Sequence, residues 1–424
     1  MKILYATTAL AAFLCFSPAA HATTSADDPE ILIKDGKFFG EVRYRYEHVD
    51  QDNALSDADA HTVRTNLGFQ TGVYHGFGGL FEGQIVQHLG DEDFNSLDNG
   101  QTTFSTVADP DTAEINRAWI EYTGIPSTSI KLGRQFINWD NQRFIGTVGW
   151  RQNDQTFDAL TLSNNSIDGL SLRYSYVDKV NRIFEGSSPP DDLEGNIHLA
   201  NISYKFADWL TAAGYGYWMD FDNEPGLTAA TANQSSRTYG LRLTGKAPIT
   251  EDWSFSYEAE AAMQEDHGDS TINYDENYYL IAPKISGHGF TLGAGYEVLQ
   301  GDGTNAFRTP LATLHKFNGW ADTFLNTPAN GLEDAYITGA YQFSDTGTIA
   351  DGLKFSATYH DFDGEERGDY GSEWDLSVGK AFTLPDAGQP FKKLNVLLKY
   401  ADYDAEDAPY FDTQKVWVQF GIKF

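Results

Sequence analysis

A strict alternation of apolar and polar residues constrains this chain more than any other feature. From Trp253 to Gln264, apolar side chains occupy every odd position and polar ones nearly every even position. This period of two predicts a β-strand, because successive side chains of a strand point to opposite faces. Twelve residues are enough for a tilted strand to cross the hydrocarbon core of a bilayer. The last ten residues, Lys415 to Phe424, repeat the pattern.

Segments of this kind recur about eighteen times, with sixteen as the alternative number. They start near residues 37, 62, 77, 114, 129, 156, 169, 196, 209, 237, 253, 276, 290, 333, 352, 371, 393 and 413. Brief turns alternate with long polar connections, as is typical of outer-membrane β-barrels, whereas soluble β-folds have shorter strands. We therefore predict an all-β fold, a transmembrane antiparallel β-barrel with long extracellular loops. Lipid cannot satisfy an open sheet edge, so the last strand must pair with the first.

The N-terminus has the features of a cleavable secretory signal. Lys2 precedes an apolar stretch from Ile3 to Phe16, and Ala20-His21-Ala22 supplies small residues for cleavage. We expect a signal peptide over 1–22, a short periplasmic segment over 23–35 and the barrel over 36–424. Cys15, the only cysteine, leaves with the signal, which excludes a disulfide or a cysteine metal site in the mature chain.

Most of the formal net charge of −32 lies in the long connections. Nine of them hold 38 of the 61 acidic residues and 7 of the 29 basic ones, namely 48–60, 89–113, 137–155, 177–195, 220–236, 265–276, 300–333, 361–370 and 401–412. An acidic exposed surface argues against nucleic-acid binding. We expect solvated loops beside lipopolysaccharide, with loose Ca²⁺ binding at runs such as Asp91-Glu92-Asp93 as the alternative. We expect no other cofactor.

The rest of the chain is close to neutral, and its arginines follow the alternation. Arg43 and Arg45, for example, alternate with Tyr44 and Tyr46. A basic side chain at mid-depth on the lipid face costs roughly 2–4 kcal/mol, so these arginines are expected to face the lumen. The candidates on predicted strands are Arg43, Arg45, Arg64, Arg117, Arg173 and Arg242. They either form a constriction that selects solutes, which we favour, or pair with inward acids to hold the interior together.

Four short motifs stand between residues 133 and 159. They are Gly133-Arg134-Gln135, Arg143-Phe144-Ile145-Gly146, Trp150-Arg151-Gln152-Asn153 and Thr156-Phe157-Asp158-Ala159. In these motifs the chain resembles the alginate-export family of outer-membrane proteins. The resemblance implies a monomeric eighteen-stranded barrel, with arginines at a constriction and long loops folded into or over the pore. It adds Arg134, Arg143 and Arg151 to the candidates.

Arg134 conflicts with the alternation. It shares the parity of Leu132, which is expected to face lipid. We expect a β-bulge at Gly133 to turn Arg134 inward, with a place in the rim near the headgroups as the alternative.

A barrel of sixteen to eighteen strands is too wide to be filled by its own wall, so we expect an aqueous lumen. The predicted function is a porin-like channel for small polar or anionic solutes. Export of an anionic polysaccharide such as alginate is the first alternative, which a nearly neutral wall disfavours. An enzyme or adhesin without an open pore is the second. No Gly-x-Ser-x-Gly or His-Glu-x-x-His motif is present. His88, His267 and His360 lie beside acidic residues, which gives the enzyme alternative only weak support. Expected partners are outer-membrane lipid, lipopolysaccharide, small solutes and the barrel-assembly machinery, the last through the strand that ends at Phe424.

Overall fold

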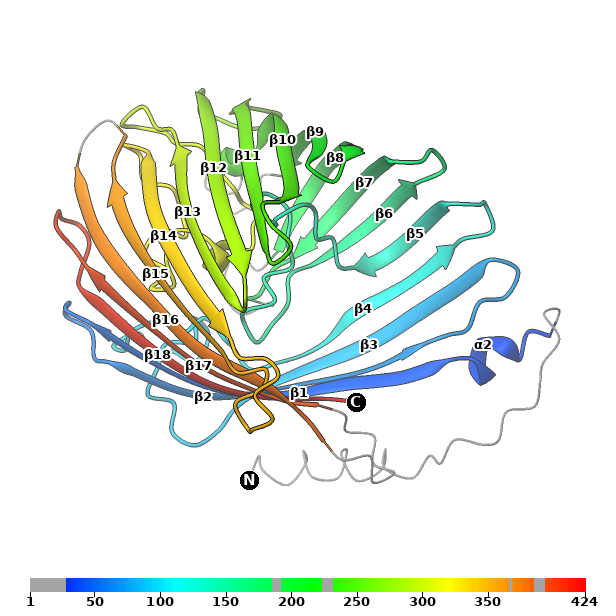
Figure 1. Ribbon diagram of the computed structural model, residues 1–424, viewed down its shortest axis with the longest axis horizontal. Helices are drawn as coiled ribbons and strands as arrows, with labels where there is room; N and C mark the ends of the chain where they lie inside the picture. The colour runs from blue at the N-terminus through cyan, green and yellow to red at the C-terminus, as the bar shows by residue number, and fades with distance from the viewer. Residues whose placement is uncertain (1–27, 185–191, 223–231, 366–367, 385–392) are drawn as a thin grey trace.

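The described residues form one antiparallel sheet that closes on itself (Figure 1). The computed structural model describes residues 28–184, 192–222, 232–365, 368–384 and 393–424, so the expected signal peptide lies outside them. The strands are β1 (Lys37–Gln51), β2 (Ala58–Gln70), β3 (Phe77–His88), β4 (Thr112–Tyr122), β5 (Thr128–Gln135), β6 (Thr156–Asn164), β7 (Leu170–Asn181), β8 (Asp192–Ala207), β9 (Leu210–Phe221), β10 (Ser236–Pro248), β11 (Trp253–Asp266), β12 (Asp275–Gly287), β13 (Phe290–Leu299), β14 (Leu332–Gln342), β15 (Lys354–Asp363), β16 (Asp369–Thr383), β17 (Lys393–Asp404) and β18 (Thr413–Lys423). The predicted eighteen-stranded barrel is confirmed, and every predicted start lies within four residues of the observed one.

The seam of the barrel joins the two ends of the chain. Strand β18 pairs with β1, with Tyr44 opposite Phe420. The backbones of Gly40 and Phe424 exchange two hydrogen bonds, of 3.1 and 3.0 Å. A short helix, α2 (Ile31–Lys34), precedes β1. The described chain has no helix of a length and apolarity that would cross a membrane. The seam therefore satisfies both edges of the sheet, as a lipid environment requires.

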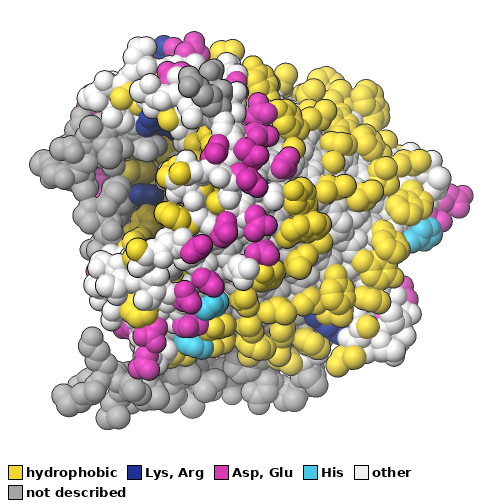
Figure 2. All heavy atoms as spheres, turned by 90° about the vertical axis from the view of Figure 1, so that its left-hand side faces the viewer, with side chains coloured by type: hydrophobic (Ala, Val, Ile, Leu, Met, Phe, Trp, Pro, Cys, Tyr) yellow, Lys and Arg dark blue, Asp and Glu magenta, His cyan; other side chains and the backbone are white. Residues whose placement is uncertain are grey.

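The outer surface carries a belt of apolar side chains. Leu241, Ile281 and Ile337 are each more than half exposed and lie on outward positions of their strands. Figure 2 shows this belt in yellow, bordered on one side by a band of acidic side chains in magenta. An apolar band with a polar border is the surface that a barrel presents to lipid. The protein is thus an outer-membrane barrel, as predicted.

Two long connections fold into the lumen, and we call them the inner loops. They are 136–155, between β5 and β6, and 300–331, between β13 and β14. Phe144 of the first inner loop lies 5.9 Å from Phe307 of the second and 5.4 Å from Tyr278 of β12, between ring centroids. These rings belong to a buried apolar cluster inside the barrel. The protein therefore has its core within the lumen, and the inner loops narrow the space that solutes can use.

Candidate functional site

Arg43 and Arg45 of β1 point into the lumen and bind the first inner loop. Arg43 donates to Gln152 Oε1 at 2.9 Å and to the carbonyl oxygen of Gly149 at 3.0 Å. Arg45 donates to the carbonyl oxygen of Trp150, and its guanidinium carbon lies 4.0 Å from the centre of a Trp150 ring. Arg45 is 0% exposed. Both arginines thus meet loop atoms, which cover them from the water of the lumen.

Arg151 lies where the two inner loops meet β1. Its guanidinium pairs with Glu47 of β1 at 3.1 Å and with Asp322 of the second inner loop at 3.0 Å. Asp109 lies 3.9 Å away. Burial lowers the pKa of Arg151, but these three carboxylates outweigh burial, and the net effect raises it. Arg151 therefore stays charged and joins the wall to both inner loops.

Some carboxylates of the long connections lie inside the lumen and pair with its arginines. Arg64 of β2 pairs with Asp154 of the first inner loop at 3.2 Å. Asp109, Asp154 and Asp322 have little or no exposed side-chain surface. The expectation that the acidic connections are solvated surface is therefore wrong for these three residues. Their carboxylates compensate buried arginines, since an unpaired charge is costly to bury.

Arg143 and Arg242 occupy the opposite side of the lumen. Arg143 Nε lies 3.0 Å from Glu297 Oε1 of β13. Arg242 of β10 pairs with Glu258 of β11 at 2.5 Å. Asn141 of the first inner loop donates to the same Glu258 carboxylate at 2.5 Å. The first inner loop thus spans the barrel from β1 to β11, and the Arg143–Glu297 pair and the Asn141–Glu258 hydrogen bond hold it on the far side.

Arg117 and Arg173 keep more contact with water. Their side chains are 22% and 24% exposed. Arg117 pairs with Glu82, and its guanidinium carbon lies 4.4 Å from the ring centre of Phe136. Arg173 pairs with Asp140 of the first inner loop at 2.9 Å. Both face the lumen, and both have a carboxylate partner.

The structure places Arg134 on the outer face of the wall. The register runs unbroken through Gly133, with Trp119 opposite Gly133 and Ala118 opposite Arg134, so the expected bulge is absent from these pairings. Arg134 therefore keeps the parity of Leu132, which is 54% exposed. It lies one residue before the extracellular end of β5, the shortest strand among those described. The expected inward position is thus wrong, and Arg134 lies on the outer face.

Arg134 has a partner there. Its Nε lies 2.9 Å from Asp158 Oδ1, the residue directly opposite on β6. Pairing with a carboxylate reduces the cost that an unpaired arginine would meet on the lipid face.

A lysine among three tryptophans was not anticipated from the sequence. Lys399 Nζ of β17 lies 3.6 and 3.9 Å from the ring centres of Trp320 and Trp150, and 5.1 Å from that of Trp417. It also lies 2.7 Å from Nε2 of His315 in the second inner loop. The alternation of Lys399 with Leu398 and Tyr400 places it inside, but its aromatic neighbours come from distant segments.

His315 links this lysine to the carboxylate of Asp322. Its Nδ1 lies 2.7 Å from Asp322 Oδ1. Burial, opposed by Asp322 and reinforced by Lys399, lowers the pKa of His315 to about 3. His315 is therefore neutral at physiological pH, and the chain Lys399–His315–Asp322–Arg151 joins β17 to both inner loops.

Two cavities of the lumen bear on the path of solutes through the described part of the chain. One, of about 430 Å³, lies toward the extracellular mouth and is lined by Arg151, His315 and Tyr410 among others. The other, of about 660 Å³, lies against β8 to β14 near the short turns. We call it the lysine cavity, because Lys205, Lys246 and Lys284 line it.

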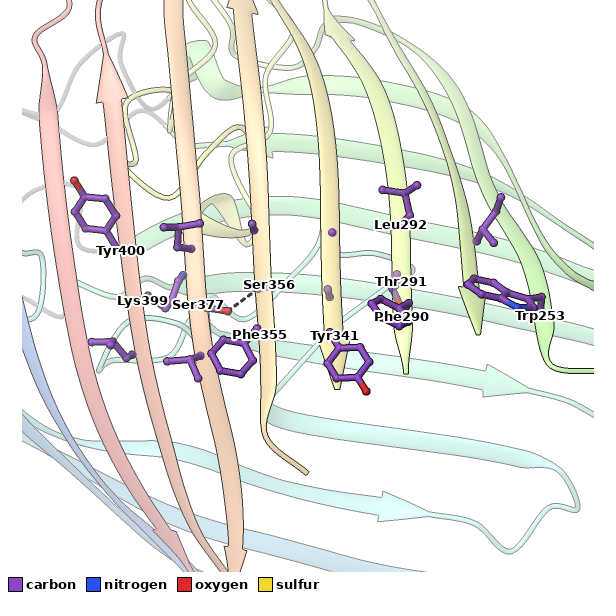
Figure 3. Close-up of a pocket in the computed structure, with 17 residues that line it drawn as sticks. Trp253, Phe290, Thr291, Leu292, Tyr341, Phe355, Ser356, Ser377, Lys399 and Tyr400 are labelled. Atoms are coloured by element: carbon purple, nitrogen blue, oxygen red, sulfur yellow. Dashed lines mark hydrogen bonds between the residues drawn. The ribbon is translucent and has the colours of Figure 1, made fainter. Parts of the chain in front are cut away.

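A hollow of about 1120 Å³ lies on the outside of the barrel. Figure 3 shows its lining across β11 to β17, including Trp253, Phe290, Leu292 and Tyr341. Ser356 and Ser377, joined by a 2.6 Å hydrogen bond, belong to the lumenal face of the same strands. The lining is almost wholly apolar and lies within the lipid-facing belt. This groove faces lipid and is no part of a solute path.

Comparisons with known proteins agree with this architecture. OccK3 (OpdO) of Pseudomonas aeruginosa superposes with a TM-score of 0.69 at 17% identity, covering 93% of this chain and 97% of that one. OpdK of the same organism, solved with vanillate, gives 0.69 at 16%, covering 92% and 99%. OccAB4 of Acinetobacter baumannii gives 0.68 at 15%, covering 92% and 98%. At these identities the likeness establishes the fold.

The sequence itself gives the family. A search of curated proteins finds no match. The sequence model of a protein family described as alginate export matches residues 36–300, which is more than half of the chain. The protein belongs to the alginate-export family.

Proposed function

We propose that this protein is a porin-like channel through which small polar or anionic solutes cross the outer membrane. The lysine cavity is the observation that carries the proposal. The two acidic residues of its lining have other partners, since Asp208 pairs with Lys205 at 2.7 Å and Glu258 with Arg242 at 2.5 Å. Neither Lys246 nor Lys284 forms an ion pair within the part of the chain that the structure describes. Uncompensated positive charge in a wet cleft raises the local concentration of anions.

The arginines support this proposal in a different way from the one expected. Arg43, Arg45, Arg64, Arg143, Arg151 and Arg242 are buried and bound to carboxylates, amides or loop carbonyls. We infer that they hold the inner loops, which form the constriction. Arg117 and Arg173, each partly exposed, extend the basic surface along the lumen. Solutes would then meet the loops and the exposed cations, and not the buried arginines.

A small carboxylate is the solute class that suits the lysine cavity. A volume of about 660 Å³ is in the range of sites for small molecules. OpdK, which shares this fold, was solved with vanillate, an aromatic carboxylate. Tyr336 also lines the lysine cavity and offers aromatic surface.

Export of an anionic polysaccharide is a second candidate, and the family description favours it. A polyuronate chain would need a continuous basic path of uncompensated charge. The lumenal arginines of this protein have carboxylate or carbonyl partners, and two inner loops occupy the lumen. Passage of small solutes is therefore the better supported function.

The expected partners follow from the barrel. We propose that the protein acts as a monomer and that the assembly machinery recognises β18, which ends beside Phe424 at the seam. The acidic band beside the apolar belt would face lipopolysaccharide, with divalent cations between the two (Figure 2).

Recording from the refolded mature protein in a planar bilayer tests the function. We expect discrete conductance steps and a reversal potential in a KCl gradient that indicates preference for chloride. Benzoate should reduce the ionic current at concentrations where benzyl alcohol, which lacks the charge, does not. Absence of conductance above background would contradict the channel and favour an enzyme or an adhesin without an open pore.

A further inference from the structure

Three potential metal ligands meet at the base of the loop 89–111, and we propose that they bind a Zn²⁺-like divalent transition metal. His88 is the last residue of β3, and Asp111 immediately precedes β4. Glu92 returns toward His88 through a turn at Gly90, whose φ of +80° favours glycine. One ligand atom from each of the three residues lies within 4.8 Å of the other two.

The state of the His88 ring points to a bound cation. The side chain is only 5% exposed, and Nε2 lies 2.8 Å from the carbonyl oxygen of Asp109. A carbonyl only accepts, so Nε2 carries a proton, and in that tautomer Nδ1 is the ring nitrogen with a lone pair. Nδ1 has no hydrogen bond and faces Glu92 Oε1 at 3.5 Å. Two acceptors directed at each other repel unless a positive species lies between them.

The contact of Nε2 is the one that metal-binding histidines make. Such a histidine usually donates its other ring N–H to a carbonyl or a carboxylate, which fixes the ring. With Zn–N and Zn–O distances of about 2.0–2.2 Å, neighbouring ligands of a tetrahedral ion are roughly 3.4 Å apart. The separation between His88 Nδ1 and Glu92 Oε1 is 3.5 Å. The buried imidazole is therefore positioned for coordination.

The two carboxylates can complete the site. Glu92 and Asp111 side chains are 41% and 58% exposed, so they can move onto an ion without repacking the interior. Asp111 Oδ1 lies 3.5 Å from Nε2 and accepts the backbone N–H of His88 at 2.6 Å, so this carboxylate would turn toward Nδ1 to bind the ion. One nitrogen and two oxygens favour zinc or a similar metal, with water as a fourth ligand. Ca²⁺ takes six to eight oxygens, which this cluster does not offer. The proposed site shares Glu92 with the run Asp91-Glu92-Asp93, where loose Ca²⁺ binding stays a prediction.

A metal here would fasten both ends of a loop that reaches the lumen. Asp109 lies two residues before Asp111, and its Oδ1 accepts the backbone N–H of Gln152 at 2.7 Å. Its Oδ2 lies 3.8 Å from Arg45. The proposed ion would thus stabilise the segment that supplies a carboxylate to the first inner loop.

Isothermal titration calorimetry of the folded mature protein in detergent tests the site, with ZnCl₂ and CaCl₂ as probes. We expect a Zn²⁺ site of one ion per chain that is lost in His88→Gln and at least tenfold weaker in Glu92→Gln. His288→Gln is the matched control, because His288 is exposed and lies 3.6 Å from a single carboxylate, Asp252. Its Zn²⁺ titration should equal that of the wild type.

The exposed position of Glu92 keeps the test valid if His88→Gln fails to fold. A wild-type protein that binds no Zn²⁺ would overturn the proposal. Equal Zn²⁺ affinity in the wild type and Glu92→Gln would also overturn it. So would Ca²⁺ binding as tight as Zn²⁺ binding, because that would indicate a nonspecific acidic surface.

Discussion

Two walls of the same lumen carry positive charge in different ways. On the wall formed by β1 and β2, Arg45 is completely covered by the first inner loop and contacts Trp150 and Asp109. On the wall formed by β10 to β12, Lys246 and Lys284 line a cavity of about 660 Å³. A basic residue that faces a pore therefore need not act on solutes. Whether a loop covers the charge decides its role.

The choice of residue fits each role. A guanidinium offers five donors in a planar fork, so it can satisfy several loop atoms at once while buried. Arg43 does this with Gln152 and Gly149. An ammonium group is strongly hydrated and keeps its charge available in water, as the lysine cavity requires.

Removing the arginine that joins β1 to both inner loops should have the largest effect. Arg151→Met leaves the carboxylates of Glu47, Asp109 and Asp322 near one another in a buried place. Removing one partner of a buried ion pair typically costs about 3–5 kcal/mol. We expect the free energy of unfolding in urea to fall by that amount, together with larger and noisier single-channel currents as the inner loops detach.

Arg237→Met provides the control for that experiment, since Arg237 and Glu265 form an exposed pair. It should unfold like the wild type. If Arg151→Met also unfolded like the wild type, the arginines would not hold the loops.

Acid should weaken the attachment of the inner loops to the wall through protonation of His315. Burial lowers the pKa of His315 to about 3, below the ordinary value of 6.5, so the unfolded chain takes up a proton more readily between pH 6.5 and pH 3. Stability is therefore complete above pH 6.5 and falls as the pH drops below it. By pH 5 the loss is about 2 kcal/mol. Asp322, whose pKa is lowered by His315 and Lys415 despite burial, contributes only at still lower pH.

Thermal unfolding at pH 7 and pH 5 measures this effect. His315→Gln can keep polar contacts with Lys399 and Asp322 but does not titrate, so its unfolding temperature should change less between the two pH values. An identical pH dependence in the wild type and His315→Gln would contradict this role.

Removing the two lysines of the lysine cavity should change the chloride current and leave the stability of the protein unchanged. Lys246→Gln combined with Lys284→Gln removes two exposed charges from the lysine cavity. A unit charge at 4 Å in water is worth about 1 kcal/mol, so the chloride conductance in 0.1 M KCl should fall by up to about fivefold. The difference should shrink in 1 M KCl, where the screening length is about 3 Å. Lys205→Gln, at a lysine already paired with Asp208, should change the current less.

The smallest effect is expected from a substitution of Arg134, which lies on the outer face of the barrel. Arg134→Gln removes one member of an ion pair with Asp158 on the outer face, and such partly exposed pairs contribute about 0–1 kcal/mol. We expect unchanged conductance and selectivity in bilayer recordings. A changed reversal potential would show that Arg134 acts on the lumen after all.

The strands could be predicted because each crossing repeats a local alternation, which needs no knowledge of the rest of the fold. The direction of Arg134 was predicted wrongly because Gly133 was expected to form a bulge, whereas its pairing is regular. The partners of the lumenal arginines depend on how the inner loops fold. Arg151 and Asp322, for example, are 171 residues apart in sequence. No local pattern reveals such a contact, so the sequence could place the arginines in the lumen but could not show that they are covered.

The reversal potential in a tenfold KCl gradient tests the division between the two walls most directly. It should be compared for the wild type, the Lys246→Gln/Lys284→Gln variant and Arg143→Lys, which keeps a positive charge beside Glu297. We expect chloride preference in the wild type, a marked loss of that preference in the lysine variant and its retention in Arg143→Lys. Unchanged selectivity in the lysine variant, with a shift in Arg143→Lys, would contradict it and return the selection of solutes to the arginines.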